Sequence, residues 1–239
     1  METVKLVTIS QQAGLVADDQ SIYSQILNDI AQGQLVSGDR LVTTQLAKKY
    51  GSSINPVREA LKQLEGEGFV AFQKNSGARV ARFAFSTMRD VFEMLQLLEP
   101  YLLKEFTQNH TPEDIAELEN IIQKMTATQA QDFTRFRELD TAFHWQLYRG
   151  HYNQEAVKLW RRKRLILQAM HANLPISHKR YSDAVAEHQT LLSFISKGAV
   201  EEANEALLAH IKSGGDYWIA QVTETASSSG YRPLQGLTG

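Results

Sequence analysis

The chain of 239 residues contains no cysteine, so it can form neither disulfides nor metal sites built on thiolates. Any bound metal must therefore be held by histidine, aspartate or glutamate. Neither sign of charge is in excess, because 25 basic and 27 acidic residues leave a formal net charge of -2. A basic surface for nucleic acid must accordingly be confined to one part of the chain.

Long hydrophobic runs are also missing. No stretch of about 18 apolar residues predicts a transmembrane helix. Residues 1–15 are interrupted by Glu2, Lys5 and other polar residues, so they lack the apolar centre of a signal peptide. The absence of cysteine fits a reducing compartment. We therefore expect a cytoplasmic protein that makes no contact with a membrane.

The length of the chain and its changes of pattern predict two folded domains. Residues 1–20 lack periodicity and are expected to form a mobile arm, and residues 227–239, with SSSG and a proline, a disordered tail. Between them we expect an N-terminal domain over 21–83, with short helices and a β-hairpin, and an all-helical domain over 84–226. The predicted fold class is mostly α.

The N-terminal domain is predicted from three short helical patterns followed by two strands. SIYSQILNDIAQG ends at Gly33, TTQLAKKYG follows with Thr43 as its cap, and a third helix begins at Ser53. FVAFQ and ARVARF flank KNSG, which predicts a β-hairpin.

The second domain is predicted to contain helices only. In TPEDIAELENII, Thr111 and Asp114 have the spacing of a capping box, and Pro112 stands at the first helical position. The other helices are expected at 87–108, 131–149, 154–173, 181–197 and 199–222.

The third short helix has two distinct faces when its residues are placed at about 100° intervals. Its apolar face contains Val57, Ala60, Leu61 and Leu64, and its opposite face contains Asn55, Arg58 and Lys62. Another short helix directly precedes it, an arrangement typical of helix-turn-helix proteins, whose second helix enters the major groove of DNA. Arginine and lysine there bind phosphates or guanine, and asparagine reads adenine.

The predicted hairpin would act as a wing beside this helix. It carries Lys74, Asn75 and Arg79, which can add contacts to the DNA backbone or the minor groove. The residues expected to contact DNA are Ser53, Asn55, Arg58, Lys62, Lys74 and Arg79. The two faces alone do not exclude an ordinary helix with solvated charges, because basic amphipathic helices are common.

The segment GDRLVTTQLAKKYGSSINPVREALKQLEGEGFVAF resembles the winged helix-turn-helix of the GntR family of bacterial transcription regulators. PVREAL, from Pro56 to Leu61, carries most of the resemblance. It implies a regulator, such as a repressor, that binds double-stranded operator DNA and is not an enzyme. The family usually has arginine at Ile54 and often a charged residue near Thr44, so we expect an operator unlike the family's usual one. Arg58 is retained, and Asn55 is expected to take over base reading.

A homodimer is expected on physical grounds. One recognition helix with about three base contacts is too small to be selective, whereas a symmetric dimer reads two halves of a pseudo-palindromic operator.

Four polar residues of the second domain lie on otherwise apolar helical stripes. Asp140 and His144 share a stripe with Phe143, and His188 and His210 lie among leucine, isoleucine and other apolar residues on two further helices. One such histidine is more often an ordinary core residue. Four groups buried together without compensation would cost several kcal/mol. A divalent cation would compensate them, with zinc favoured and nickel or manganese also compatible.

The other histidines are not predicted to bind the metal. His110, His151 and His178 adjoin helix ends or loops and are expected at the surface, whereas the pattern assigns no place to His171.

The segments LDTAFHWQLY, EHQTLLSFISKG and ANEALLAHI resemble the all-helical FCD ligand-binding domain of the FadR branch of the GntR family. The resemblance implies a metal held at the four positions named above and a small carboxylate effector bound beside it. The family often has arginine about one turn before its glutamate, here Glu99, but this chain has Leu95. Arg137 and Arg164 are the substitute candidates for effector binding, with solvated surface charge as the alternative.

Two other functions stay open at this point. Three histidines and an aspartate can also hold a catalytic metal, which predicts a metal-dependent hydrolase. The sequence has no HExxH motif, nucleophile elbow or glycine-rich phosphate loop that would support a hydrolase. The alternative is a helical sensor or adaptor that does not bind DNA, which the unusual Ile54 allows. The favoured hypothesis is that the protein is an operator-binding regulator modulated by a small organic acid bound near a metal.

Overall fold

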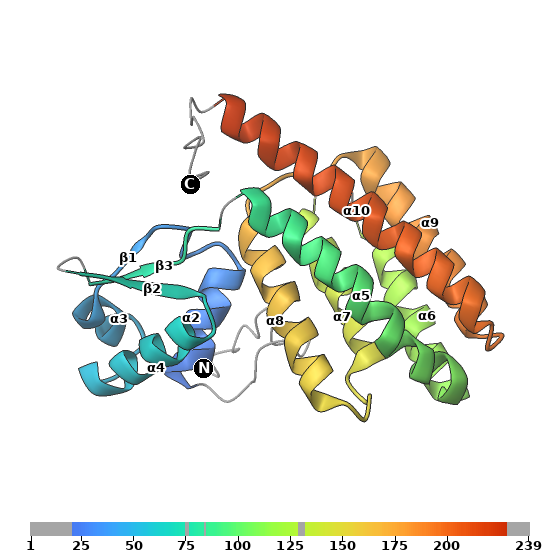
Figure 1. Ribbon diagram of the computed structural model, residues 1–239, viewed down its shortest axis with the longest axis horizontal. Helices are drawn as coiled ribbons and strands as arrows, with labels where there is room; N and C mark the ends of the chain where they lie inside the picture. Colours follow the sequence, from blue (N-terminus) through green and yellow to red (C-terminus); the bar gives the residue numbers. More distant parts are fainter. Residues whose placement is uncertain (1–20, 75–76, 84, 129–131, 229–239) are drawn as a thin grey trace, which may run out of the picture.

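The computed structural model describes residues 21–74, 77–83, 85–128 and 132–228. A winged unit with a small sheet is followed by a bundle of long helices (Figure 1). This order confirms the predicted fold class, mostly α with an N-terminal winged helix-turn-helix and a C-terminal helical bundle. The predicted arm (1–20), Asn75 and residues 229–239 of the predicted tail lie outside the described residues.

The winged unit places its helices against one another and its strands at one edge. Its elements are α2 (Ile22–Ala31), β1 (Arg40–Leu41), α3 (Thr43–Lys49), α4 (Ile54–Gly66), β2 (Val70–Gln73) and β3 (Gly77–Val80). The strands form an antiparallel sheet in the order β1-β3-β2. Arg79 on β3 lies opposite Arg40 of β1 and Ala71 of β2.

Helix α4 packs against the core of the winged unit through its apolar face. The buried residues of this face are Val57, Ala60, Leu61 and Leu64. After the helix, Gly68 takes a left-handed φ of 81° and its N–H donates to the carbonyl of Glu65 at 2.9 Å. The N–H of Phe69 then donates to the Leu64 carbonyl at 2.9 Å, which completes a Schellman turn. This turn brings the Phe69 ring into the core and leads the chain into β2.

Two details of the winged unit differ from the sequence prediction, and a third agrees with it in position only. Strand β1 is not predicted, because two residues are too few to show a periodicity. Thr43 is not a cap but the first residue of α3, and Val42 occupies the cap position. Ser53 does occupy the N-cap position of α4, yet among the described residues its side chain makes no capping hydrogen bond.

The second half is a helical bundle, as predicted. Its helices are α5 (Phe85–Asn109), α6 (Pro112–Ala127), α7 (Phe133–Tyr148), α8 (Gln154–His171), α9 (His178–Ile195) and α10 (Val200–Ser228). Helix α9 begins earlier than predicted because the Ser177 hydroxyl oxygen accepts the N–H of Arg180 at 3.2 Å. Helix α10 extends past the predicted end at 222 and takes in the first two residues of the predicted tail.

Two glycines mark places where helices come close together. Helices α5 and α10 run side by side in Figure 1, and a Cβ atom at Gly215 of α10 would lie 3.0 Å from Cγ of Phe92. Gly33, which follows α2 with a φ of 71°, lies against the end of α8. A Cβ there would come within 2.8 Å of the Ala172 Cβ, and Asn173 Nδ2 donates to the Gly33 carbonyl at 3.5 Å. The winged unit therefore rests on the C-terminal end of α8.

Over the described ranges, no helix has both the length and the apolar character needed to cross a lipid bilayer.

The capping box at the start of α6 provides a test of the fold. The Thr111 hydroxyl oxygen accepts the Asp114 N–H at 3.2 Å, and the Asp114 carboxylate accepts the Thr111 N–H at 2.9 Å. Thr111→Ala should lower the free energy of unfolding by about 1 kcal/mol. Thr190→Ala is the matched control, because the exposed Thr190 hydroxyl only donates to the Ala186 carbonyl within its own helix. That change should be neutral or slightly stabilising, because alanine favours helix. Urea unfolding of both variants at equal metal content measures the difference, and equal losses would contradict it.

Candidate metal centre and DNA-binding surface

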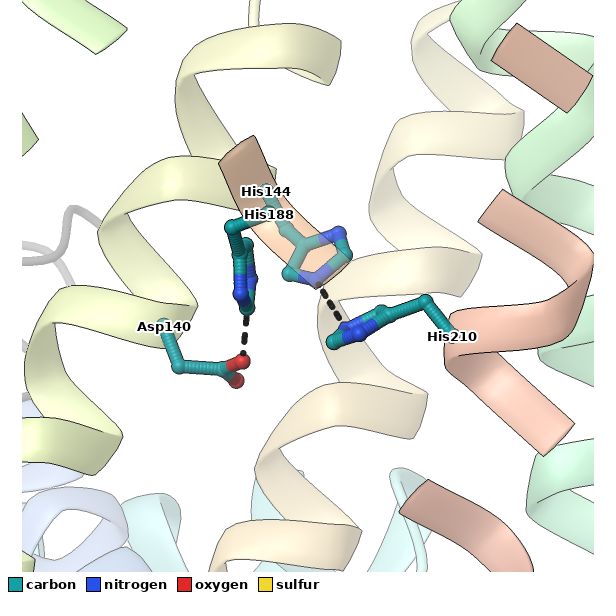
Figure 2. A group of neighbouring side chains, drawn as sticks. All are labelled: Asp140, His144, His188 and His210. Atoms are coloured by element: carbon teal, nitrogen blue, oxygen red, sulfur yellow. Dashed lines mark hydrogen bonds and ion pairs between the residues drawn. The ribbon is translucent and has the colours of Figure 1, made fainter. Parts of the chain in front are cut away.

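The four predicted metal ligands lie together in the middle of the bundle (Figure 2). Asp140 and His144 extend from successive turns of α7, His188 comes from α9 and His210 from α10. One ligand atom of each residue lies within 4.8 Å of the others. The three imidazoles are buried, and Asp140 is partly buried. Helical spacing thus places a pair on α7, and packing of α9 and α10 supplies the rest.

The imidazoles meet through their Nε2 atoms. His144 Nε2 and His210 Nε2 are 3.3 Å apart, and His188 Nε2 lies 3.3 Å from Asp140 Oδ1. Among the described residues, His188 Nε2 has no hydrogen-bond partner. Ligand atoms about 2.1 Å from a cation are themselves about 3 to 4 Å apart. The spacing and the donor types therefore fit a divalent cation.

The opposite nitrogen of each ring faces an oxygen that can accept a proton. His188 Nδ1 donates to the Ala184 carbonyl at 2.7 Å, and His210 Nδ1 lies 2.7 Å from Glu187 Oε2. His144 Nδ1 lies 3.3 Å from Glu99 Oε2. These acceptors favour a proton on Nδ1 and leave the Nε2 lone pairs directed at one another. Outer partners of this kind orient metal-binding histidines in proteins.

The outer carboxylates are themselves held by hydrogen bonds. Glu99 is fully buried and accepts from the Tyr148 hydroxyl at 3.0 Å and from Trp160 Nε1 at 2.9 Å. Burial alone would raise the pKa of Glu99, but His144, Arg164 and the Trp160 hydrogen bond lower it overall. Glu99 is thus an ionised carboxylate inside the bundle.

Glu187 has a similar role beside His210. Burial would raise its pKa, but hydrogen bonds from His210 and Arg180 lower the pKa of Glu187 to about 2. Arg180 donates to both carboxylate oxygens, at 2.8 and 2.9 Å. Burial, together with the nearby His188, lowers the pKa of His210 to about 4. At neutral pH this imidazole is therefore uncharged and able to bind a cation.

Asp140 also pairs with a cation of the chain itself. Its Oδ2 accepts from Arg164 Nη2. Burial would raise the pKa of Asp140, but the Arg164 charge and the neighbouring histidines hold it well below its usual range. Oδ2 therefore binds Arg164, whereas Oδ1 faces His188 and is directed at the cluster.

A cavity of about 60 Å³ adjoins the cluster. Both predicted effector-binding residues line it, but neither is a solvated surface charge. Arg164 is mostly buried against Asp140. Arg137 donates to the carbonyls at the end of α8, namely Ala172 at 2.8 Å, Leu174 at 2.9 Å and His171 at 3.3 Å. Leu95 is buried in the cavity wall where the family often has arginine.

Two residues beside the metal cluster were not predicted from the sequence. Glu187 and Arg180 carry no pattern that separates them from exposed helix residues. The prediction for His151 is wrong, because the residue is buried. Its ring stacks on Tyr152 with centroids 4.5 Å apart, and its Nε2 lies 3.2 Å from Glu105. His178 is exposed as expected, and His110 is half-buried.

The predicted DNA-contacting residues of α4 lie on its outer surface. Ser53, Asn55, Arg58 and Lys62 are exposed, on the side opposite the buried face. A groove of about 330 Å³ runs between α4 and the sheet, lined in part by Arg58, Lys62, Arg40 and Phe72. A basic helix with an adjacent wing can lie along a DNA groove.

The two predicted wing residues differ from each other. Lys74 is exposed at the end of β2. Arg79 is on the central strand, where its Nη1 donates to the Gly38 carbonyl at 3.0 Å. Arg79 therefore also holds the turn before β1 in place.

The sequence matches two protein families. Residues 19–80 match the family described as bacterial regulatory proteins, gntR family, and residues 90–213 match the FCD domain. The Uxu operon regulator of Haemophilus influenzae is 32% identical over 204 residues, which cover 77% of this chain and 75% of that protein. A protein named as the probable D-xylose utilization operon transcriptional repressor of Paenarthrobacter nicotinovorans is 24% identical and covers 86% of the chain.

Solved structures share the fold. The Escherichia coli protein McbR/YncC superposes with a TM-score of 0.76 at 20% identity, over 84% of this chain and 96% of that one. A GntR-type regulator from Rhodococcus gives 0.71 at 18% identity, over 83% and 96%. At these identities the likeness concerns the fold.

Proposed function

Since the chain belongs to the GntR family of bacterial regulatory proteins and carries an FCD domain, we propose that it represses transcription from an operator under the control of a small organic acid. The observation that carries the proposal is the buried cluster of three Nε2 atoms and a carboxylate next to a cavity. The matched families and the relatives are those of regulators, so the chain is a transcription regulator and not a hydrolase. We assign operator binding to residues 21–83 and effector binding to residues 84–226, in the manner of the FadR branch, and place the protein in the cytoplasm.

Operator recognition is proposed for the exposed face of α4 and the wing. Arg58 and Lys62 supply positive charge and Asn55 an amide, while the buried face fixes the orientation of the helix. We propose a homodimer that reads a pseudo-palindromic site. The neighbouring helices α5 and α10 support this proposal, because they expose Leu97 (73% accessible), Tyr101 and Leu208 to solvent.

Replacement of Arg58 tests operator binding. Arg58→Ala should weaken specific binding by about 1 to 3 kcal/mol, because a charged contact to DNA is lost. The operator would first be selected from a random library with the wild-type protein. Arg89→Ala is the matched control, because Arg89 is an exposed arginine on α5, outside the winged unit. Fluorescence anisotropy at one fixed salt concentration gives both affinities. Wild-type affinity in Arg58→Ala would refute this surface and favour a sensor that does not bind DNA.

A metal is proposed at Asp140, His144, His188 and His210, one per subunit. Three imidazoles and one carboxylate suit zinc, and nickel or manganese accept the same ligand types. When bound, such a cation attracts and coordinates carboxylate oxygens. The residues of the chain do the positioning, because Glu99, Glu187 and the Ala184 carbonyl face the Nδ1 atoms of the three rings.

Removal of a histidine tests the metal proposal. His188→Ala and His210→Ala should each lower metal content and Tm, because a cation bound only by the folded state stabilises it. His178→Ala, at the exposed start of α9, is the control and should change neither. Native mass spectrometry reads metal content and subunit number together. Absence of metal after reconstitution at about pH 7.5 would contradict the proposal.

The effector is proposed to be a small carboxylate in the cavity beside the cluster. Arg164 lines this cavity and pairs with Asp140 through Nη2, but among the described residues its Nε has no hydrogen-bond partner. The carboxylate would therefore meet positive charge from both metal and guanidinium. Helix α8 connects the cavity to the winged unit. Its Arg164 faces the cavity, whereas Arg162 Nη2 approaches Gly68 at the end of α4. A shift of α8 on effector binding would therefore act directly on the recognition helix.

Linkage between the two sites tests this coupling. If a carboxylate changes operator affinity by some factor, operator must change carboxylate affinity by the same factor, typically about 5- to 150-fold. Calorimetric titration of short carboxylates into metal-loaded and metal-stripped protein, with and without operator, measures both effects. We expect binding that needs the metal and depends on operator. Equal affinity of a confirmed effector with and without metal would make the metal purely structural.

A further inference from the structure

The cavity has a second polar region, away from the metal cluster. Arg164, Gln168 and His171 are spaced i, i+4 and i+7 along α8, so one face of this helix supplies all three to the cavity wall. Arg164 pairs with the cluster residue Asp140. His171 lies at the other end of the row, about 10 Å further along the helix axis at about 1.5 Å per residue.

His171 is buried without full use of its hydrogen-bonding groups. The residue is 8% exposed and lines the cavity, and among the described residues its Nδ1 has no hydrogen-bond partner. Its ring stacks on Trp218 of α10, with centroids 4.7 Å apart and planes 19° apart. Burial, with the charge of Arg137 nearby, lowers the pKa of His171 to about 3, so the imidazole is neutral at physiological pH. Buried polar atoms without partners are uncommon and call for a reason.

Two neutral polar groups lie in the same region of the wall. Gln168 Nε2 donates to the Thr141 hydroxyl oxygen at 2.9 Å, and both residues are buried and line the cavity. Imidazole, amide and hydroxyl together offer donors and acceptors but no net charge. Such a set suits an uncharged group that can both donate and accept, as a hydroxyl does.

We infer that His171, Gln168 and Thr141 form a subsite that binds a hydroxyl group of the effector, at the end remote from its carboxylate. This inference rests on the proposed function, since it assumes that a carboxylate is held at the metal and Arg164. The ligand class is a short hydroxycarboxylate. A second carboxylate would find no unpaired cation here, because Arg137 is engaged with three carbonyl groups and Arg180 with Glu187. An ammonium group would be repelled by the same arginines.

The volume of the cavity limits the length of the ligand. A water molecule needs about 10 to 15 Å³ of such volume, so 60 Å³ holds roughly four to six waters. Asp140, His144 and His210 also line this cavity, so a bound cation would occupy part of it and the ligand can have at most about that many non-hydrogen atoms. The subsite also lies at the end of α8 that contacts the winged unit, because the next residue, Ala172, lies against Gly33. A hydroxyl bound there would act close to the contact between the two units.

The test compares 3-hydroxypropanoate with propanoate, which differ only in a terminal hydroxyl. Calorimetry on the metal-loaded, full-length protein should give about tenfold tighter binding of 3-hydroxypropanoate, since one additional buried neutral hydrogen bond has about this effect. His171→Phe keeps an aromatic ring against Trp218 but removes both nitrogens. In this variant the affinity ratio should fall to near one, while propanoate affinity and metal content stay as in wild type.

Two further variants keep the test decisive. His178→Phe makes the same replacement at an exposed position outside the cavity and should retain the tenfold ratio. Gln168→Leu is used if His171→Phe loses metal or unfolds, and it should also reduce the ratio. Equal affinity of the two acids for wild type, or a ratio that persists in both cavity variants, would overturn the subsite and leave carboxylate binding intact. Failure of both acids to bind wild-type protein would instead overturn the carboxylate proposal, and the subsite with it.

Discussion

Burial of polar groups inside an apolar bundle is the constraint on which the C-terminal half depends. A polar group removed from water must find a partner, or it destabilises the fold. Here each histidine of the cluster has an oxygen facing its Nδ1, and these oxygens belong to Glu99, Glu187 and the Ala184 carbonyl. The carboxylates in turn accept hydrogen bonds from further residues. The Nδ1 atoms of His188 and His210 are therefore satisfied by the protein. Among the described residues, His144 Nδ1 and His188 Nε2 have no hydrogen-bond partner, and His188 Nε2 belongs to the cluster itself.

Helix α8 joins the two halves of the molecule in a physical sense. One face lines the cavity with Arg164 and His171, and Arg162 of the same helix approaches Gly68. Directly after the helix, Ala172 lies against Gly33 of the winged unit. A helix is stiff over this length, so a displacement of one face moves the other. The family relationship makes regulation the function of the chain, and α8 is a helix that contacts both the cavity and the winged unit.

The distribution of charge follows the same division of roles. The chain is nearly neutral as a whole, yet Arg58 and Lys62 are exposed beside the groove between α4 and the sheet. In the bundle, arginines 137, 164 and 180 line the cavity, each paired with carbonyl or carboxylate oxygens. Positive charge is thus available to DNA at one surface and is held in fixed positions in the interior.

The sequence by itself determined the helices, the amphipathic α4 and the inward direction of Asp140, His144, His188 and His210, because each follows from the local period of a helix. Only the tertiary structure decided which side chains from distant segments meet. It buried His151 beneath Tyr152, turned Arg164 towards Asp140 and brought Glu187 to His210. It also added β1, whose two residues become a strand only by pairing with β3. Periodicity specifies which side of a helix faces inward, whereas the partner on that side depends on how separate helices pack.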